Sequence, residues 1–198
     1  MPNQRKNTVQ NIINNLRFHH PSISDEAIEE LSGCLTKCTF PRRYQLIREG
    51  IFCKVAYFIE QGITRSFWLV EGEEVTTSFA AEGAIVFSMD ELYFGKVSEE
   101  FVETIEEVVA YRINLDDLNR LFETNLDLAN WGRKIHQYEY RRIHQTHKER
   151  LTMSVTDRYQ QMKIQFPDVC ARVNLGLIAS YIGTTLPTLS RIRASLEG

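Results

Sequence analysis

The sequence lacks the long apolar segments that membrane insertion or export would require. It has no uninterrupted run of about 18 apolar residues, which a transmembrane helix needs. Its first residues, MPNQRKNTVQNIINNL, lack the continuous apolar core and small-residue cleavage site of a secretory signal. We therefore expect a cytoplasmic protein without membrane association.

Cysteine is scarce, and its spacing does not favour a metal site. The four cysteines are Cys34, Cys38, Cys53 and Cys170. Cys34 and Cys38 lie four residues apart on an expected helix and could share a face, but structural zinc or iron–sulfur sites usually need four ligands in tighter clusters. We expect free, buried thiols and no metal.

Residue patterns of the common enzymes are also missing. Residues 40–113, the expected barrel, contain no histidine, which argues against a cupin-type metal enzyme. No Ser-His-Asp or Cys-His arrangement and no phosphate-binding glycine loop stands out. We expect neither catalysis nor a bound cofactor.

Charge is distributed unevenly along the chain. Residues 1–130 hold 12 Lys and Arg and 21 Asp and Glu (net −9), residues 131–198 hold 11 and 5 (net +6), and the sum is −3. The basic C-terminal part favours contact with a polyanion. A basic helical surface without a partner is the alternative, and charge alone does not decide between them.

The first 124 residues predict helices followed by an antiparallel β-structure. Helices are expected over residues 8–18 and Asp25–Cys38, the second capped by Ser24. After Pro41, short segments of alternating β-branched and aromatic residues are separated by turns, one of them the hairpin Glu71-Gly72, which predicts a barrel or sandwich. The expected strands are Tyr44–Arg48, Val55–Glu60, Thr64–Leu69, Glu74–Phe79, Ala84–Ser88 and a pair over Phe101–Ile113.

A single long helix is expected from about Leu126 to Thr146, and another from about Ser154 to Phe166. In the long helix, steps of three and four residues define a narrow stripe typical of a two-helix coiled coil. We expect this stripe at a homodimer interface, with packing against the chain's own β-domain as the alternative. Its members are Leu128, Trp131, Ile135, Tyr138 and Arg142.

Residues 175–196, LGLIASYIGTTLPTLSRIRASL, predict two short helices around a tight turn at Gly183. Ala179 allows close crossing, and Gly183 supplies a positive φ. Thr185 is expected to cap the second helix, whose first turn tolerates Pro187. Apolar residues expected between the two helices are Ile178, Ile182, Leu189 and Ile192.

The outer surface of the second helix is the candidate DNA-contacting surface. Its residues are Thr185, Leu186, Thr188, Ser190, Arg191 and Arg193. Arg191 could read guanine, while Thr185, Ser190 and Arg193 fit phosphate contacts. An ordinary helical hairpin in a small α-domain is the alternative.

These segments resemble the Crp/Fnr family of bacterial regulators, in particular a divergent branch common in Bacteroidetes. The segment IASYIGTTLPTLSRIR is similar to the family's helix-turn-helix. The segment PRRYQLIREGIFCKVAYFIEQGITRSFWLVEGEEVTTSF is similar to its cyclic-nucleotide-binding-like β-roll, and ERLTMSVTDRYQQMKIQFP to the stretch that leads into its DNA-binding domain. The resemblance covers about residues 25–196.

The resemblance implies an α+β fold in three parts. These are an antiparallel β-roll with N-terminal helices (1–124), a dimerisation helix (125–150) and a helix-turn-helix domain (151–198). It also implies a homodimer on palindromic double-stranded DNA, with RNA polymerase and an unidentified small-molecule effector as candidate partners.

Three departures from the family pattern limit what can be carried over. The positions of the nucleotide-phosphate cassette hold Phe87-Ser88 and Ser98-Glu99, a candidate effector pocket whose acidic surroundings would repel a cyclic phosphate, so no response to cyclic AMP is expected. An Arg-Glu pair that begins the family's recognition helix is Leu186-Pro187 here, and we expect no C-terminal wing after that helix. A ligand-binding or protein-interaction module with weak or no DNA binding is the alternative function.

Overall fold

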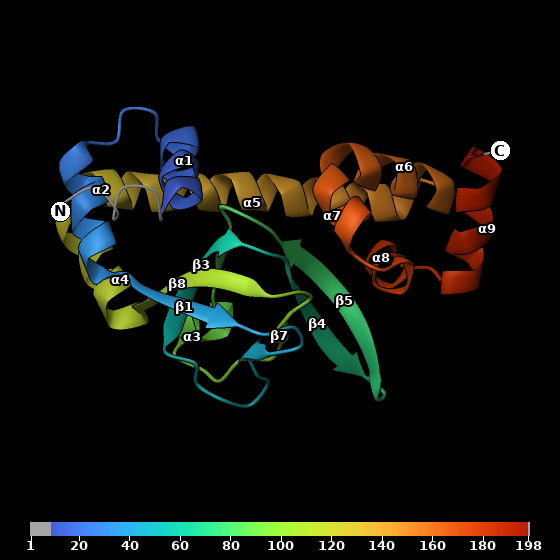
Figure 1. Ribbon diagram of the computed structural model, residues 1–198, viewed down its shortest axis with the longest axis horizontal. Coiled ribbons are helices and arrows are strands. Elements are labelled where there is room, and N and C mark those ends of the chain that lie inside the picture. The colour runs from blue at the N-terminus through green and yellow to red at the C-terminus, as the bar shows by residue number, and fades with distance from the viewer. Residues whose placement is uncertain (1–8, 198) are drawn as a thin grey trace.

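This computed structural model describes residues 9–197. The long helix α5 runs along the length of the molecule (Figure 1). The first short helices and the β-roll lie on one part of α5, and the last helices of the chain gather at its C-terminal end (Figure 1). The helices are α1 (Gln10–His19), α2 (Asp25–Cys34), α3 (Met89–Phe94), α4 (Leu115–Thr124), α5 (Leu126–Thr152), α6 (Val155–Gln165), α7 (Pro167–Arg172), α8 (Leu175–Ile182) and α9 (Leu186–Glu197).

The β-roll consists of two four-stranded antiparallel sheets, in the orders β1-β8-β3-β6 and β2-β7-β4-β5. The strands are β1 (Thr36–Phe40), β2 (Gln45–Ile47), β3 (Val55–Gln61), β4 (Thr64–Val70), β5 (Glu73–Ala80), β6 (Ile85–Val86), β7 (Phe101–Thr104) and β8 (Val108–Asn114). The hairpin expected at Glu71-Gly72 is confirmed between β4 and β5, with φ values of 54° and 86°. Positive φ at both turn residues suits the twist of a two-residue hairpin.

The prediction of one helix over Asp25–Cys38 is wrong in its last four residues. Helix α2 ends at Cys34, and the next residues form β1, in which Cys38 pairs with Ala110 of β8. Sheet pairing overrides the helical spacing of Cys34 and Cys38, and the Cys38 thiol donates to the Ala110 carbonyl at 3.3 Å. The short helices α3 and α7 were not expected from the sequence, and α5 extends to Thr152, beyond the expected Thr146.

The stripe expected at the dimer interface needs correction, because most of it packs inside the chain. Leu128, Trp131 and Ile135 are 0%, 1% and 9% exposed and belong to the core shared with α1, α2, α4 and the β-roll. The Trp131 ring stacks on Phe58 with centroids 6.0 Å apart. The alternative, packing against the chain's own N-terminal half, therefore describes these three residues.

The other two residues of the stripe are partly accessible. Tyr138 is 50% exposed and meets the ring of His19 edge-on at 5.2 Å, so it too leans on the chain's own α1. Arg142 pairs with Glu139 one turn earlier on α5, at 2.7 Å. A second copy would have to contact α5 mainly on another face.

The described residues contain no helix long and apolar enough to cross a membrane. They also contain no group of three or more His, Cys, Asp or Glu side chains that could hold a metal ion.

Candidate nucleic-acid interface

The turn between α8 and α9 has the geometry that the sequence predicts. Gly183 adopts a left-handed conformation (φ 74°, ψ 48°) at the C-cap of α8. Its N–H donates to the Ser180 carbonyl at 3.1 Å, and the Thr184 N–H donates to the Ala179 carbonyl at 2.9 Å. Thr185 caps α9, because its Oγ1 accepts a hydrogen bond from the Thr188 N–H at 3.4 Å.

The two helices bury the apolar residues that were expected between them. Ile178, Ile182 and Leu189 are 2%, 4% and 0% exposed, and Ile192 packs against the same cluster. Ala179 is 1% exposed, so a small side chain occupies the crossing point. These contacts fix which side of α9 faces outward.

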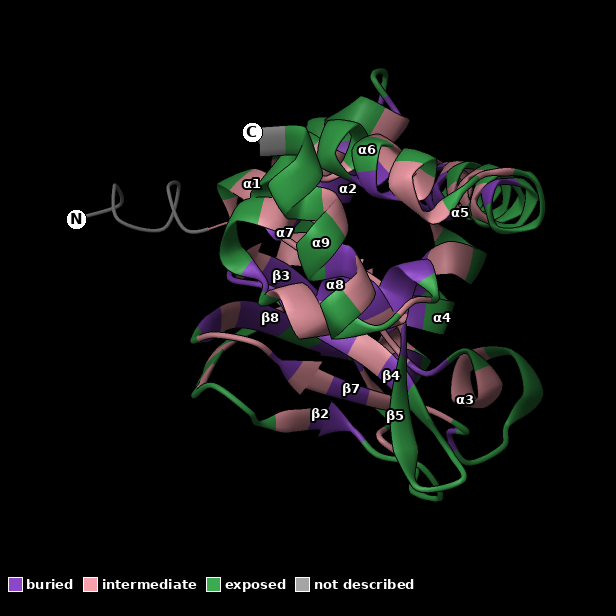
Figure 2. Ribbon diagram, turned by 90° about the vertical axis from the view of Figure 1, so that its right-hand side faces the viewer, coloured by how far each residue is buried: buried purple, intermediate pink, exposed green. Residues whose placement is uncertain are grey.

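The outward side of α9 carries most of the predicted DNA-contacting residues. Thr185, Leu186, Ser190, Arg191 and Arg193 are exposed, and Thr188 is half-buried. Figure 2 shows this exposed face of α9 in front of the more buried α8. Five of the six predicted residues are thus accessible to solvent.

Arg191 and Arg193 are the unpaired cations of this surface. Within residues 9–197, neither guanidinium forms an ion pair or a side-chain hydrogen bond. An exposed guanidinium without an internal partner is suited to bind a phosphate group or a guanine base of another molecule.

Other arginines of the basic C-terminal part are used internally, and two of them complete the end of α8. Arg150, near the end of α5, donates to the Tyr181 carbonyl at 2.7 Å. Arg158 of α6 donates from Nε to the Ile182 carbonyl at 3.1 Å. With the bonds from Gly183 and Thr184, the last four carbonyls of α8 all have donors.

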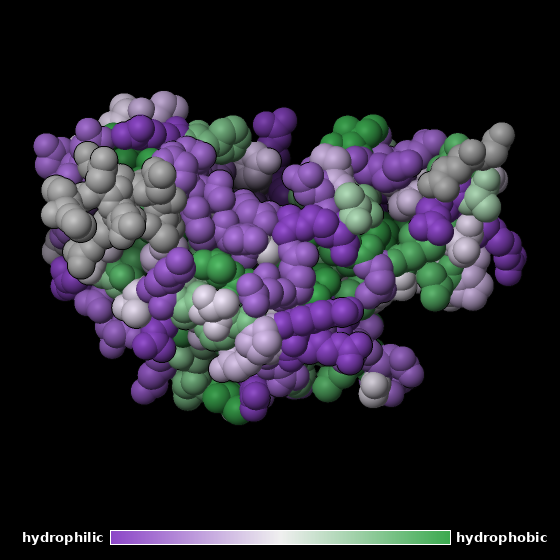
Figure 3. Space-filling model, in the orientation of Figure 1, coloured by the Kyte–Doolittle hydropathy of each residue, from purple (hydrophilic) through white to green (hydrophobic). Residues whose placement is uncertain are grey.

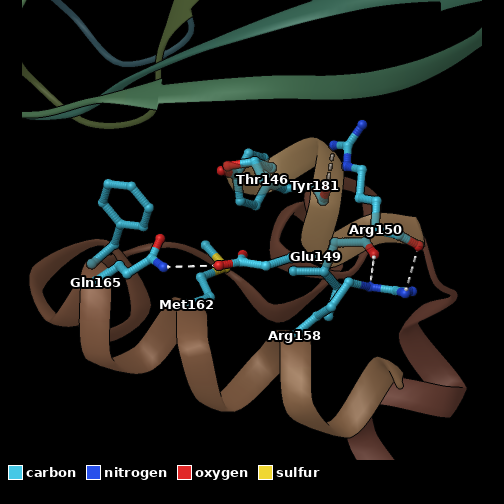
Figure 4. A pocket seen from close by; sticks show the side chains of 9 residues that line it. Thr146, Glu149, Arg150, Arg158, Met162, Gln165 and Tyr181 are labelled. Atoms are coloured by element: carbon cyan, nitrogen blue, oxygen red, sulfur yellow. Dashed lines mark hydrogen bonds between the residues drawn. The ribbon is translucent and has the colours of Figure 1, made fainter. Parts of the chain in front are cut away.

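The same contacts form a compact joint between α5 and the helix-turn-helix (Figure 4). Nη1 of Arg158 also donates to the Met153 carbonyl, at 2.9 Å, where α5 ends. Glu149 is buried in this joint and accepts hydrogen bonds from the side-chain amides of Gln145 (3.0 Å) and Gln165 (3.3 Å). The end of α5 is therefore tied by hydrogen bonds to α8 and the Gly183 turn.

Helix α8 also docks on the edge strand β5 of the β-roll. The Thr76 N–H donates to the Ser180 hydroxyl at 2.9 Å, and the Phe79 and Tyr181 rings lie 5.4 Å apart. Arg172 of α7 bridges from the same side to Glu82, at 2.8 Å, and to Glu106. The helix-turn-helix is thus held on the β-roll through α8, while the outward side of α9 remains exposed to solvent.

The residues of the candidate effector pocket serve local structure. Ser88 is 0% exposed and caps α3, accepting from the Glu91 N–H at 3.3 Å. Ser98 is 1% exposed and donates to the Glu100 carbonyl at 3.0 Å. Phe87 packs against the core, whereas Glu99 is exposed, so these four side chains do not line one common cavity wall.

Carboxylates surround this region. Glu91 accepts the Cys53 and Lys54 N–H groups at 2.8 and 2.7 Å, and Asp90 accepts the Glu99 N–H at 3.0 Å. Burial, together with the charge of nearby Asp90, raises the pKa of Glu100 from 4.5 to about 7. A negatively charged environment of this kind disfavours a further anion.

The residues that orient the helix-turn-helix were not predicted from the sequence. Arg150, Arg158 and Arg172 were counted only as contributors to net charge, because an arginine that binds carbonyls has no characteristic spacing. One signal was present: the end of α8 needs donors for its terminal carbonyls, and nearby arginines can supply them.

Comparisons of sequence give no match: no protein-family profile and no curated protein matches the chain. Solved structures do match. The regulator CLP of Xanthomonas campestris, described as c-di-GMP responsive, is 17% identical, with 88% of this chain and 92% of that chain covered and a TM-score of 0.70. FixK2 from Bradyrhizobium japonicum is 17% identical over 82% of this chain and 84% of that chain, with a TM-score of 0.70.

A third match is a transcriptional regulator described as of the crp/fnr family from Eubacterium rectale. It is 12% identical, with 89% of this chain and 85% of that chain covered and a TM-score of 0.69. The chain therefore has the fold of these regulators: a cyclic-nucleotide-binding-like β-roll, a long helix and a C-terminal helix-turn-helix.

Glu100 gives a pH-dependent test of the β-roll. Because its folded pKa is raised, the folded state binds its proton more tightly than the unfolded state. The associated stability is present below the unfolded value of 4.5 and is lost as pH rises through about 7. Denaturant titrations measure the free energy of unfolding at each pH. As pH rises from 4.5 to above 7, the stability of Glu100→Gln relative to the unmodified protein should increase by on the order of 3 kcal/mol. The control is Glu99→Gln, at the exposed neighbouring residue. If the stability of Glu100→Gln follows the same pH dependence as that of the unmodified protein, the raised pKa of Glu100 is contradicted.

Proposed function

We propose that this chain is a DNA-binding transcriptional regulator of the Crp/Fnr type, which acts as a homodimer on a palindromic duplex site. The observation that carries the proposal is the exposed face of α9, where Arg191 and Arg193 lack partners within the described residues. The fold shared with the solved regulators supports it.

In this proposal, α9 enters the major groove with its N-terminal turns near the base edges. Arg191 donates to a guanine, and Arg193, Ser190 and Thr185 contact phosphates that fix the register. Leu186 is 49% exposed at the start of the helix and fits an apolar contact with a thymine methyl group.

We place the dimer interface on the face of α5 opposite the stripe expected from the sequence. Tyr140 and Ile143 are 74% and 55% exposed, although both carry large apolar side chains. With His136 and His147, which are also exposed, they follow steps of four, three and four residues. This spacing is that of a coiled-coil seam, so two α5 helices would bury it against each other.

Cyclic AMP is not the proposed effector. The positions where a phosphate would sit are occupied by buried serines that cap and close local turns, and Asp90, Glu91 and Glu100 lie nearby. A cyclic phosphate needs a cation and free donors.

DNA binding is tested by titrating salt against a pool of duplex fragments. We expect affinity to fall steeply with salt, because phosphate contacts release counterions. Arg193→Ala should weaken binding to all sequences. It should also reduce the slope of log affinity against log salt concentration by about one for each α9 that binds.

Arg191→Ala should relax the preference at one base position, at a cost of about 1–3 kcal/mol.

The matched control is Arg133→Ala, which removes the same charge from an exposed position on α5. If Arg191→Ala and Arg193→Ala both bind like Arg133→Ala, α9 is not the recognition helix. The protein would then be a ligand-binding or protein-interaction module with this fold.

The dimer seam is tested by light scattering of Ile143→Asp. A carboxylate at the centre of the seam should convert the dimer to a folded monomer, because burying an unpaired charge is costly. Arg141→Asp, on a different face of α5, should remain dimeric. A dimeric Ile143→Asp protein, or a monomeric unmodified protein, would contradict the seam.

A further inference from the structure

A cleft of about 360 Å³ opens where the β-roll meets the helix-turn-helix. The turn between β1 and β2 contributes Arg42 and Arg43, the β4-β5-β7 sheet contributes Arg65, and the start of α8 contributes Asn174. Figure 3 shows strongly hydrophilic side chains gathered over the strands that face the C-terminal helices. This cleft is separate from the face of α9 and from the region around Ser88 and Ser98.

The turn that carries Arg42 and Arg43 is held rigidly. Arg43 has a φ of 64°, which is unusual for a residue other than glycine. Thr104, which is 0% exposed, fixes the turn: its carbonyl accepts the Arg43 N–H at 2.8 Å, its Oγ1 accepts the Tyr44 N–H at 2.9 Å, and its hydroxyl donates to the Pro41 carbonyl at 2.7 Å. The two arginines are thus presented on a preorganised support.

The two acidic side chains of the cleft share one buried arginine. Arg65 is only 4% exposed and pairs with both Glu74 and Glu103, the latter at 2.6 Å. By contrast, the Arg42 and Arg43 guanidinium groups form no ion pair or hydrogen bond within residues 9–197. The three arginines outnumber the two glutamates, so the cleft keeps a net positive charge.

The opposite wall adds a third positive element. Asn174 caps α8 by accepting the Leu177 N–H at 3.0 Å, and Leu177 itself lines the cleft. The N-terminal end of α8, which carries a partial positive charge, therefore borders the same cleft as Arg42 and Arg43.

We propose that this cleft binds the phosphate group of a small phosphorylated molecule. The forked guanidinium groups of Arg42 and Arg43 suit phosphate oxygens, and the N-terminus of α8 supplies the dipole. The volume falls in the range of small-molecule pockets, and Ile105 and Leu177 offer an apolar surface for the rest of the ligand. Such a ligand would bridge the β-roll and α8 and so fix the docking of the helix-turn-helix.

The test is calorimetric titration of the full-length protein with inorganic pyrophosphate at low ionic strength. We expect one saturable site per chain, and at least about tenfold weaker binding in the double variant Arg42→Ala/Arg43→Ala, since each lost arginine removes a charge-assisted hydrogen bond. The matched control is Arg48→Ala/Arg112→Ala, which removes two exposed arginines outside the cleft and should bind like the unmodified protein.

The proposal is overturned if pyrophosphate does not saturate, or if both double variants weaken binding equally, since that would mean general electrostatic attraction. It is also overturned if Arg42→Ala/Arg43→Ala leaves pyrophosphate binding unchanged but lowers the affinity for duplex DNA, because the arginines would then contact the DNA backbone. Pyrophosphate binding does not depend on α9, so this test can succeed or fail independently of the proposed DNA binding.

Discussion

The placement of α9 depends on the donation of two arginines to the C-terminal carbonyls of α8. A helix leaves its last four carbonyls without partners, and in α8 two are satisfied by the Gly183 turn and two by Arg150 and Arg158. Arg150 belongs to α5 and Arg158 to α6, so the turn that orients α9 is tied to the long helix. Breaking these bonds would leave buried carbonyls unsatisfied as well as releasing α9.

This joint gives α5 two functions on two faces. One face buries Trp131 in the core of the N-terminal half, so α5 cannot rotate freely against the β-roll. The opposite face exposes Tyr140 and Ile143, where the proposed partner copy packs. In the proposed dimer, Arg150 is the contact that links α5 to the turn before α9, whereas the proposed cleft lies on the side of α8 that faces the β-roll.

Local signals in the sequence predicted a large part of this arrangement. The Gly183 turn, the Thr185 cap and the Glu71-Gly72 hairpin were predictable because each depends on neighbouring residues and a specific backbone conformation. The stripe through Trp131 was misassigned because spacing shows that a face is buried, but not whether the chain or a second copy covers it. The roles of Arg150 and Arg158 depend on contacts between distant elements, which no local pattern records.

The most direct measurement is hydroxyl-radical footprinting of the protein on a duplex selected from a random pool at low salt. The account predicts two protected segments whose centres lie about 10 base pairs apart or at a multiple of that distance, because two α9 helices enter successive major grooves on one face of the DNA. Protection should disappear with Arg191→Ala/Arg193→Ala. No protection at low salt, or protection that persists in that double variant, would contradict the claim that α9 reads DNA.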